Sequence, residues 1–183
     1  MRIISGTARG TKLFTLKGDN TRPTLDRVKE SLFNIINRKI YESQVLDLFA
    51  GSGAIGLECA SRGAKKVVLC DSSKDAINII NKNIEKTHLK EKIELIKNDA
   101  LLTLEKLKNE KFDIIFLDPP YNSQLIEKTV DKIFLQNMLS TNGTLIVETD
   151  DEERILKEIE KYKENIYDTR NYGRVKLIFL RKE

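Results

Sequence analysis

The chain of 183 residues contains one histidine, two cysteines and no long apolar run. Cys59 and Cys70 lie in apolar segments without the CxxC spacing of a zinc ligand pair, so we expect two buried, reduced thiols and no metal site. His88 lies in the polar stretch KTHLKEK and is expected on the surface. These scarcities argue against zinc chemistry and against a Cys/His nucleophile.

Membrane and export signals are also missing from the sequence. No apolar run approaches the roughly 20 residues of a membrane-spanning helix, so no membrane partner is expected. The N-terminal stretch MRIISGTARGTKLF lacks an apolar segment followed by a small-residue cleavage site. We expect a cytoplasmic monomer with one domain over residues 1–183, in which residues 1–44 form an extension and residues 45–183 form the core.

Positive charge gathers near the N-terminus, although the net charge is only +4. The basic residues there are Arg2, Arg9, Lys12, Lys17, Arg22, Arg27 and Lys29, and the acidic ones are Asp19, Asp26 and Glu30. Such a stretch suits the phosphate backbone of a nucleic acid, and an ordinary solvated surface explains it equally well.

Hydrophobic periodicity predicts strands that alternate with helices after residue 44. The expected strands are 45–49, 66–71, 92–97, 113–118 and 144–149, and the expected helices are 54–62, 74–86, 101–108, 124–135 and 152–163. This order is typical of an α/β, Rossmann-like, doubly wound sheet whose ligands bind at the carboxyl ends of the strands. A hairpin around Gly173 is expected to complete a seven-stranded, mostly parallel sheet with an antiparallel end.

The first 44 residues predict a small hairpin around TARG and then an amphipathic helix. Residues 24–39 of that helix place Leu25, Val28, Leu32 and Ile35 on one face.

A glycine-rich stretch, VLDLFAGSGAIGLE, joins the first core strand to its helix. Gly51, Gly53 and Gly56 match the GxGxxG pattern of dinucleotide sites. Asp47, however, precedes the glycines inside the strand, where its charge would repel a pyrophosphate and attract an ammonium group. The stretch therefore favours S-adenosylmethionine, which carries an ammonium, a sulfonium and a carboxylate.

Two further acids are expected at the ends of the next strands. Asp71 lies 18 residues beyond Gly53, close to the roughly 20 at which an acid receives a ribose hydroxyl pair, although it could instead bond its own loop. Asp99, beside Ala100, fits either a contact to the adenine amino group or a helix N-cap.

The stretch DPPY at residues 118–121 suits an exocyclic amino group. Such a nitrogen shares its lone pair with the ring and becomes nucleophilic when acceptors hold its two N–H bonds. Asp118 and the carbonyl of Pro119 are expected to supply these acceptors, with the fixed φ angles of Pro119 and Pro120 aiming the carbonyl. Tyr121 is expected to stack on an extruded base.

The combination of RIISGTARGTKL, TRPTLDRVKESLFNII, DLFAGSGAIGLECASRGA and FLDPPY resembles, over nearly the whole chain, the bacterial 16S ribosomal RNA guanine-N2 methyltransferases of the RsmD-like family. The resemblance implies methyl transfer from S-adenosylmethionine to N2 of one guanine in the small ribosomal subunit or an assembly intermediate. It also implies that the RPT segment, Arg22 to Thr24, lies near the methionine end of the cofactor. Arg22 could equally be a solvated charge, and Pro23 and Thr24 simple helix-start residues.

Asp71 departs from the family, for which we expect glutamate at that position. The residues expected at the cofactor are Asp47, Phe49, Gly51, Ser52, Gly53, Asp71, Asp99, Ala100, Arg22 and Thr24. The roles of Glu58 and Glu148 stay open. The alternatives are a DNA adenine or cytosine amino methyltransferase, an NAD-dependent oxidoreductase, and a non-catalytic nucleic-acid-binding module.

Overall fold

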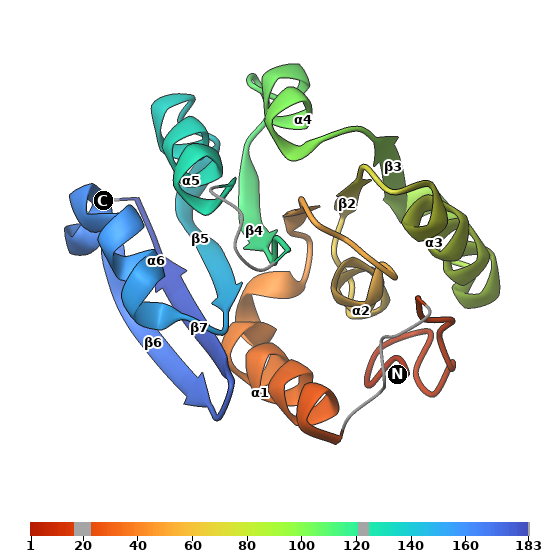
Figure 1. The fold of residues 1–183 in the computed structure, drawn as a ribbon. Helices are drawn as coiled ribbons and strands as arrows, with labels where there is room; N and C mark the ends of the chain where they lie inside the picture. The colour runs from red at the N-terminus through yellow and green to blue at the C-terminus, as the bar shows by residue number, and fades with distance from the viewer. Residues whose placement is uncertain (17–22, 121–124, 183) are drawn as a thin grey trace.

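The computed structural model describes residues 1–16, 23–120 and 125–182, without the side chains of 23–26. Seven strands form one sheet in the order β3-β2-β1-β4-β5-β7-β6 (Figure 1). The strands are β1 (Gln44–Asp47), β2 (Lys66–Asp71), β3 (Ile93–Lys97), β4 (Phe112–Leu117), β5 (Leu139–Thr149), β6 (Ile166–Tyr172) and β7 (Val175–Leu180). β1 to β5 pair in parallel, and β7 runs antiparallel to both of its neighbours. The predicted fold class is confirmed.

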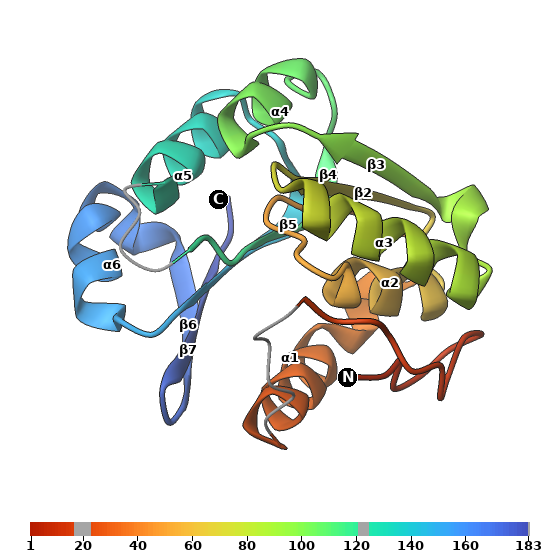
Figure 2. The ribbon, with the colours of Figure 1, turned by 45° about the vertical axis from the view of Figure 1, so that its right-hand side comes forward.

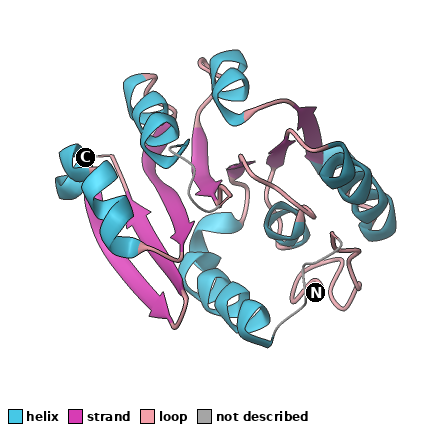
Figure 3. Ribbon diagram, viewed as in Figure 1, coloured by secondary structure: helices cyan, strands magenta, loops and turns pink. Residues whose placement is uncertain are grey.

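Helices cover both faces of the sheet, as the crossover connections between parallel strands require (Figure 3). They are α1 (Pro23–Ile40), α2 (Ala54–Ser61), α3 (Lys74–Thr87), α4 (Ala100–Lys106), α5 (Leu125–Leu135) and α6 (Glu152–Glu158), with 3-10 turns η1 (Lys90–Lys92) and η2 (Glu160–Asn165). α1, α2 and α3 lie on one face, and α4, α5 and α6 lie on the other (Figure 1). Within the described residues, no helix is both long enough and apolar enough to cross a bilayer.

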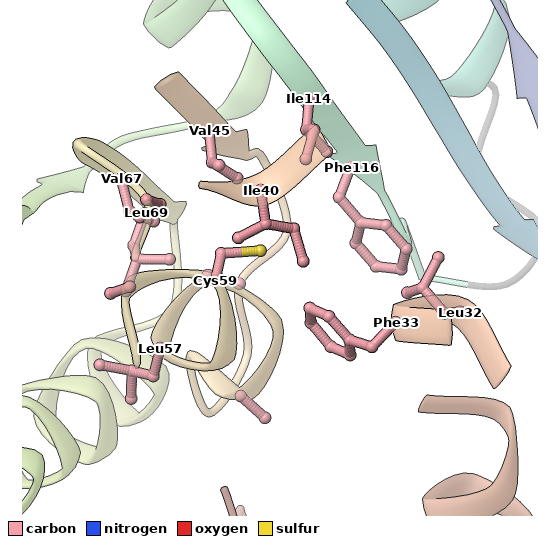
Figure 4. Close-up of a cluster of buried hydrophobic side chains, with 14 of the residues drawn as sticks. Leu32, Phe33, Ile40, Val45, Leu57, Cys59, Val67, Leu69, Ile114 and Phe116 are labelled. Carbon is pink, nitrogen blue, oxygen red and sulfur yellow. The ribbon is translucent and has the colours of Figure 1, made fainter. Parts of the chain in front are cut away.

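Each face of the sheet has its own hydrophobic core. On the α1 and α2 side, Phe33 and Leu57 pack toward Val45, Leu69 and Phe116 of the strands (Figure 4). Because alternate residues of a strand point to opposite faces, the residues between these, such as Leu46 and Leu117, belong to the second core. Burial on both faces explains why the strand sequences are continuously apolar.

The N-terminal segment, residues 1–16, runs along α2 near α1 and α3 (Figure 2). It forms the expected hairpin only as an isolated antiparallel bridge between Arg2 and Lys12, with Ile3 N–H donating to Thr11 O at 3.0 Å. Its position depends on buried side chains of the helices, which are described with the site.

Two expectations about the helices are wrong. Ile35 is 36% exposed, because the buried face of α1 passes through Phe33, Ile36 and Ile40 instead. The expected helix 152–163 ends at Glu158, and η2 follows. Non-helical Tyr162 (φ −108°) in η2 stacks its ring on Phe134 with centroids 4.5 Å apart.

Strand β5 begins earlier than its apolar run predicts. The polar stretch STNG at 140–143 resembles a turn, and Asn142 does have a left-handed φ of 64°. The chain nevertheless stays in the strand, because Leu139 pairs with Phe112 before the register shifts.

Candidate active site

A cavity of about 580 Å³ opens where the carboxyl ends of β1, β2, β4 and β5 meet. Of the residues predicted for the site, those that line the cavity are Asp47, Phe49, Gly51, Ser52, Asp71, Asp99, Ala100, Asp118, Pro119 and Pro120. Gly53 does not line the cavity itself, but its neighbours Ser52 and Ala54 do. Arg22 and Tyr121 lie outside the described residues, and Thr24 lies in the first turn of α1 without a described side chain. The structure thus brings together residues from four segments of the sequence.

The glycine-rich turn begins directly after β1 and is fixed from both sides. Gly51 and Gly53 adopt left-handed φ values of 56° and 77°, which side chains rarely tolerate. Gly51 N–H donates to Asp71 Oδ2 at 2.9 Å, and Asn83 Nδ2, buried on α3, donates to Ser52 O at 2.8 Å. The turn therefore arrives at the cavity with its peptide groups already oriented.

Asp47 is the most buried acid of the cavity, at 1% exposure. Among the described residues, its Oδ1 atom has no hydrogen-bond partner. Burial, followed by the charge of Asp118, raises the pKa of Asp47 to about 7, and the backbone amides of Phe49 and Gly56 oppose that shift. A buried carboxylate with an unsatisfied oxygen is costly unless a ligand supplies a donor, so this position suits a cation.

Asp71 ends β2 and bonds its own surroundings. Its Oδ2 accepts the Gly51 amide, and its Oδ1 accepts the Ser73 amide at 2.9 Å. The loop-bonding alternative is therefore observed. Each carboxylate oxygen has a second acceptor position, so these bonds leave the ribose assignment as a proposal.

Asp99 follows β3 and caps α4. Its Oδ1 accepts the Leu102 amide at 2.9 Å, which is the geometry of an N-cap. Of the two expected roles, the cap is observed, and the contact to adenine stays a prediction. Both Asp99 and Ala100 still line the cavity.

Asp118, Pro119 and Pro120 directly follow strand β4 and line the cavity. Asp118 and Pro120 are exposed, whereas Pro119 is buried. Because β4 ends at Leu117 and pairs with β1, this segment lies at the carboxyl ends of the strands, next to the end of β1.

Two charged residues of the wall, Glu148 and Lys29, were not assigned from the sequence. Glu148 on β5 is half-buried, and burial together with the charges of Asp118 and Asp47 raises its pKa to about 8. Lys29 on α1 is 4% exposed, and its Nζ lies 3.1 Å from Glu58 Oε2. Lys29 lines the cavity because α1 packs on one face of the sheet through Phe33 and Ile40, a relation that no local motif encodes.

Glu58 has a structural role, which the sequence left open. This fully buried carboxylate accepts the amides of Ile4 at 2.8 Å and Ser5 at 2.9 Å. It also pairs with Lys29 and with Arg62, whose Nε lies 2.8 Å away. Sequence could show the Arg62 partner at i+4, but backbone donors 54 residues away leave no signal.

The N-terminal segment closes one side of the cavity through Met1, Thr15 and Leu16. Asn83 Oδ1 accepts the Phe14 amide at 2.8 Å while its Nδ2 also donates to Phe14 O at 3.0 Å. Asn83 thus ties this segment to the glycine-rich turn.

Comparison with known proteins places the chain in a family. The family model described as Conserved hypothetical protein 95 matches residues 1–181. "Ribosomal RNA small subunit methyltransferase D" of Haemophilus influenzae is 39% identical over 158 residues, 85% of this chain and 82% of that protein. The protein of the same name from Escherichia coli K12 is 37% identical over 79% of this chain and 69% of its own length.

Solved structures agree with this placement. The structure titled "Putative methyltransferase yhhF from Escherichia coli" aligns with a TM-score of 0.82 and 31% identity, covering 98% of this chain and 96% of that one. The fold is therefore that of the Rossmann-like methyltransferases. The chain belongs to the Conserved hypothetical protein 95 family, in which the small subunit methyltransferases D are its relatives, and the family resemblance is confirmed.

Proposed function

We propose that the protein is an S-adenosylmethionine-dependent methyltransferase that acts on the exocyclic N2 amino group of a guanine in 16S ribosomal RNA of the small subunit. One observation carries the proposal. The buried, unsatisfied carboxylate of Asp47 shares a cavity with the Asp118 and Pro119 segment. A cation-binding position and a set of acceptors for an amine thus lie in one pocket.

The cavity suits this cofactor better than a dinucleotide. Asp47, Asp71, Asp118 and Glu148 line it, and Lys29 is the one cationic side chain among its described lining residues. A pyrophosphate would be repelled there. The proposed contacts are Asp47 to the ammonium, Asp71 to the ribose hydroxyls, and Asp99 with the Ala100 amide to adenine.

The acceptor base is proposed to lie against Asp118. When bound, S-adenosylmethionine supplies an electrophilic methyl group carried on a sulfonium. A carboxylate oxygen of Asp118 and the carbonyl of Pro119 accept the two N–H bonds, which returns the lone pair to nitrogen. Once nitrogen is methylated and cationic, its proton passes to Asp118 or to water. Tyr121, assigned from the sequence alone, would stack on the base.

The RNA assignment rests on the family and on charge. Curated relatives are named as ribosomal RNA methyltransferases. Arg2, Arg9 and Lys12 are exposed on the segment that walls the cavity, where they can contact phosphates. Because guanine N2 faces the minor groove when paired, the target is proposed to be unpaired or flipped out.

The test uses Asp118→Ala and small ribosomal subunits from cells that lack the enzyme. Wild-type protein should transfer labelled methyl groups to their RNA, and the variant should lose about 10²- to 10⁴-fold in rate. Calorimetry should show that the variant still binds S-adenosylmethionine. Asp75→Ala, which removes an exposed acid of α3, is the matched control and should behave as wild type.

Three results would defeat parts of the proposal. Methylation of duplex DNA but not of RNA would refute the substrate. Tight binding of NADH without binding of S-adenosylmethionine would favour the oxidoreductase alternative. Cofactor binding without methylation of any nucleic acid would favour the non-catalytic module.

A further inference from the structure

The pairing of β4 with β5 sets Glu148 beside Asp118. Leu117 pairs with Val147 in parallel register, and both side chains point into the core under α4, α5 and α6. Glu148 follows Val147 within β5 and so points toward the α1 face, while Asp118 directly follows the end of β4, and both residues line the cavity. Adjacent strands lie about 4.8 Å apart, so the two acids leave neighbouring strands at the same level, and the charge of Asp118 acts on Glu148.

Glu148 is an acid of the cavity wall whose carboxyl has no hydrogen-bond or ion-pair partner among the described residues. Asp71 and Asp99 accept backbone amides, and buried Glu58 is fully paired. Among the described residues, no hydrogen bond or ion pair engages the Glu148 carboxyl, although the side chain is half-buried and lines the cavity. Placing an acid in such a position costs free energy, so a ligand donor is the expected partner.

We propose that Glu148 is a specificity-determining residue that accepts the N1–H of the target guanine, next to the N2 amino group held by Asp118 and Pro119. This inference rests on the proposed function. Guanine presents N1–H and N2–H donors on the same edge, so two neighbouring carboxylates fit that edge. Adenine and 2-aminopurine have an acceptor at N1, which a carboxylate repels.

The electrostatics of the cavity agree with this role. Burial and the charges of Asp118 and Asp47 raise the pKa of Glu148 to about 8, which favours the protonated carboxyl, and a bound cation or N–H donor would shift it toward the carboxylate. A cationic cofactor bound near Asp47 would supply such a charge. The ionised carboxylate then selects a base with a donor at N1.

The experiment compares guanine with 2-aminopurine, which keeps the N2 amino group but has no N1–H. Small-subunit RNA carrying either base at the mapped target nucleotide is methylated under single-turnover conditions by wild type, Glu148→Gln and Glu127→Gln. Wild type should prefer guanine by about 10- to 100-fold. Glu148→Gln should lose most of that preference, mainly through a slower guanine reaction, while calorimetry shows S-adenosylmethionine still bound.

Glu127→Gln is the control, because it makes the same chemical change at an exposed position of α5. It should keep the wild-type preference. If Glu148 were only structural, Glu148→Gln would lower the melting temperature and slow both bases equally. An undiminished guanine preference in the variant overturns this inference alone, whereas a wild type that methylates no RNA overturns the proposed function.

Discussion

Asp47→Asn is expected to make the protein more stable relative to wild type at high pH than at low pH, and to abolish most of its binding of S-adenosylmethionine. Folding raises the pKa of Asp47 from 3.8 to about 7, so between these values the native state binds more protons than the unfolded state. Stability contributed by this group therefore falls as pH rises through that window. At 1% exposure, the side chain has little solvent screening to weaken the effect.

The magnitude follows from linkage. With pKa values of 3.8 unfolded and about 7 folded, Asp47 alone should cost wild type about 2.5 kcal/mol of unfolding free energy between about pH 5 and about pH 8. Asparagine cannot ionise, so the variant escapes this loss. The cost of any unpaired amide hydrogen in the variant is the same at both pH values and cancels in the comparison.

Urea unfolding of both proteins at the two pH values measures this difference. Without cofactor, the stability of the variant relative to wild type should rise by that amount from low to high pH. Asp75→Asn, at an exposed position, should show no such trend. Calorimetry should find that Asp47→Asn has lost most of its affinity for S-adenosylmethionine. Equal pH dependence in wild type and variant would refute the assignment of a buried, destabilising charge.

Two further substitutions, studied by urea unfolding and cofactor calorimetry, test how the N-terminal segment (residues 1–16) is held against the cavity. Glu58→Ala leaves Lys29 without its buried partner and should destabilise by about 3–5 kcal/mol, whereas Glu153→Ala, on an exposed surface pair, should change stability by less than about 1 kcal/mol. Gly6→Ala would place a Cβ 1.8 Å from Ser61 O, so it should destabilise by about 1–3 kcal/mol and weaken cofactor binding. Gly10→Ala, with a similar φ of +85° but open space around the new Cβ, should bind cofactor normally. Equal effects of the two glycine variants would contradict the inference that packing of the N-terminal segment against Ser61 supports the cavity.

The sheet and the strand-end residues could be predicted because their signals are local. Apolar runs separated by helical periods imply parallel strands, and parallel strands bring their carboxyl ends to one edge. Asp47, Asp71 and Asp118 each end such a run, so the topology alone places them around one cavity. The glycine-rich turn is equally local, because its left-handed φ values call for glycine.

The rest of the site depends on contacts that no local pattern records. Lys29 reaches the cavity because α1 packs on one face of the sheet, and Glu148 does so because β5 pairs in one register rather than another. Ile35 and Ile36 both suit a helical face, and only the packing of α1 selects Ile36 for burial. Asp99 shows a further limit, since one carboxylate suits a cap and a ligand alike.

The N-terminal segment is held by the buried side chains of Ile3, Ala8 and Leu13 and by hydrogen bonds to its peptide groups. Glu58 and Asn83 form hydrogen bonds to main-chain atoms of Ile4, Ser5 and Phe14. These bonds do not depend on which side chains the three residues have. The exposed side chains of this segment can therefore be substituted without breaking the hydrogen bonds that hold its main chain. New charged or aromatic side chains could be introduced at its exposed positions to change which RNA it contacts, while the lining of the cavity stays unchanged.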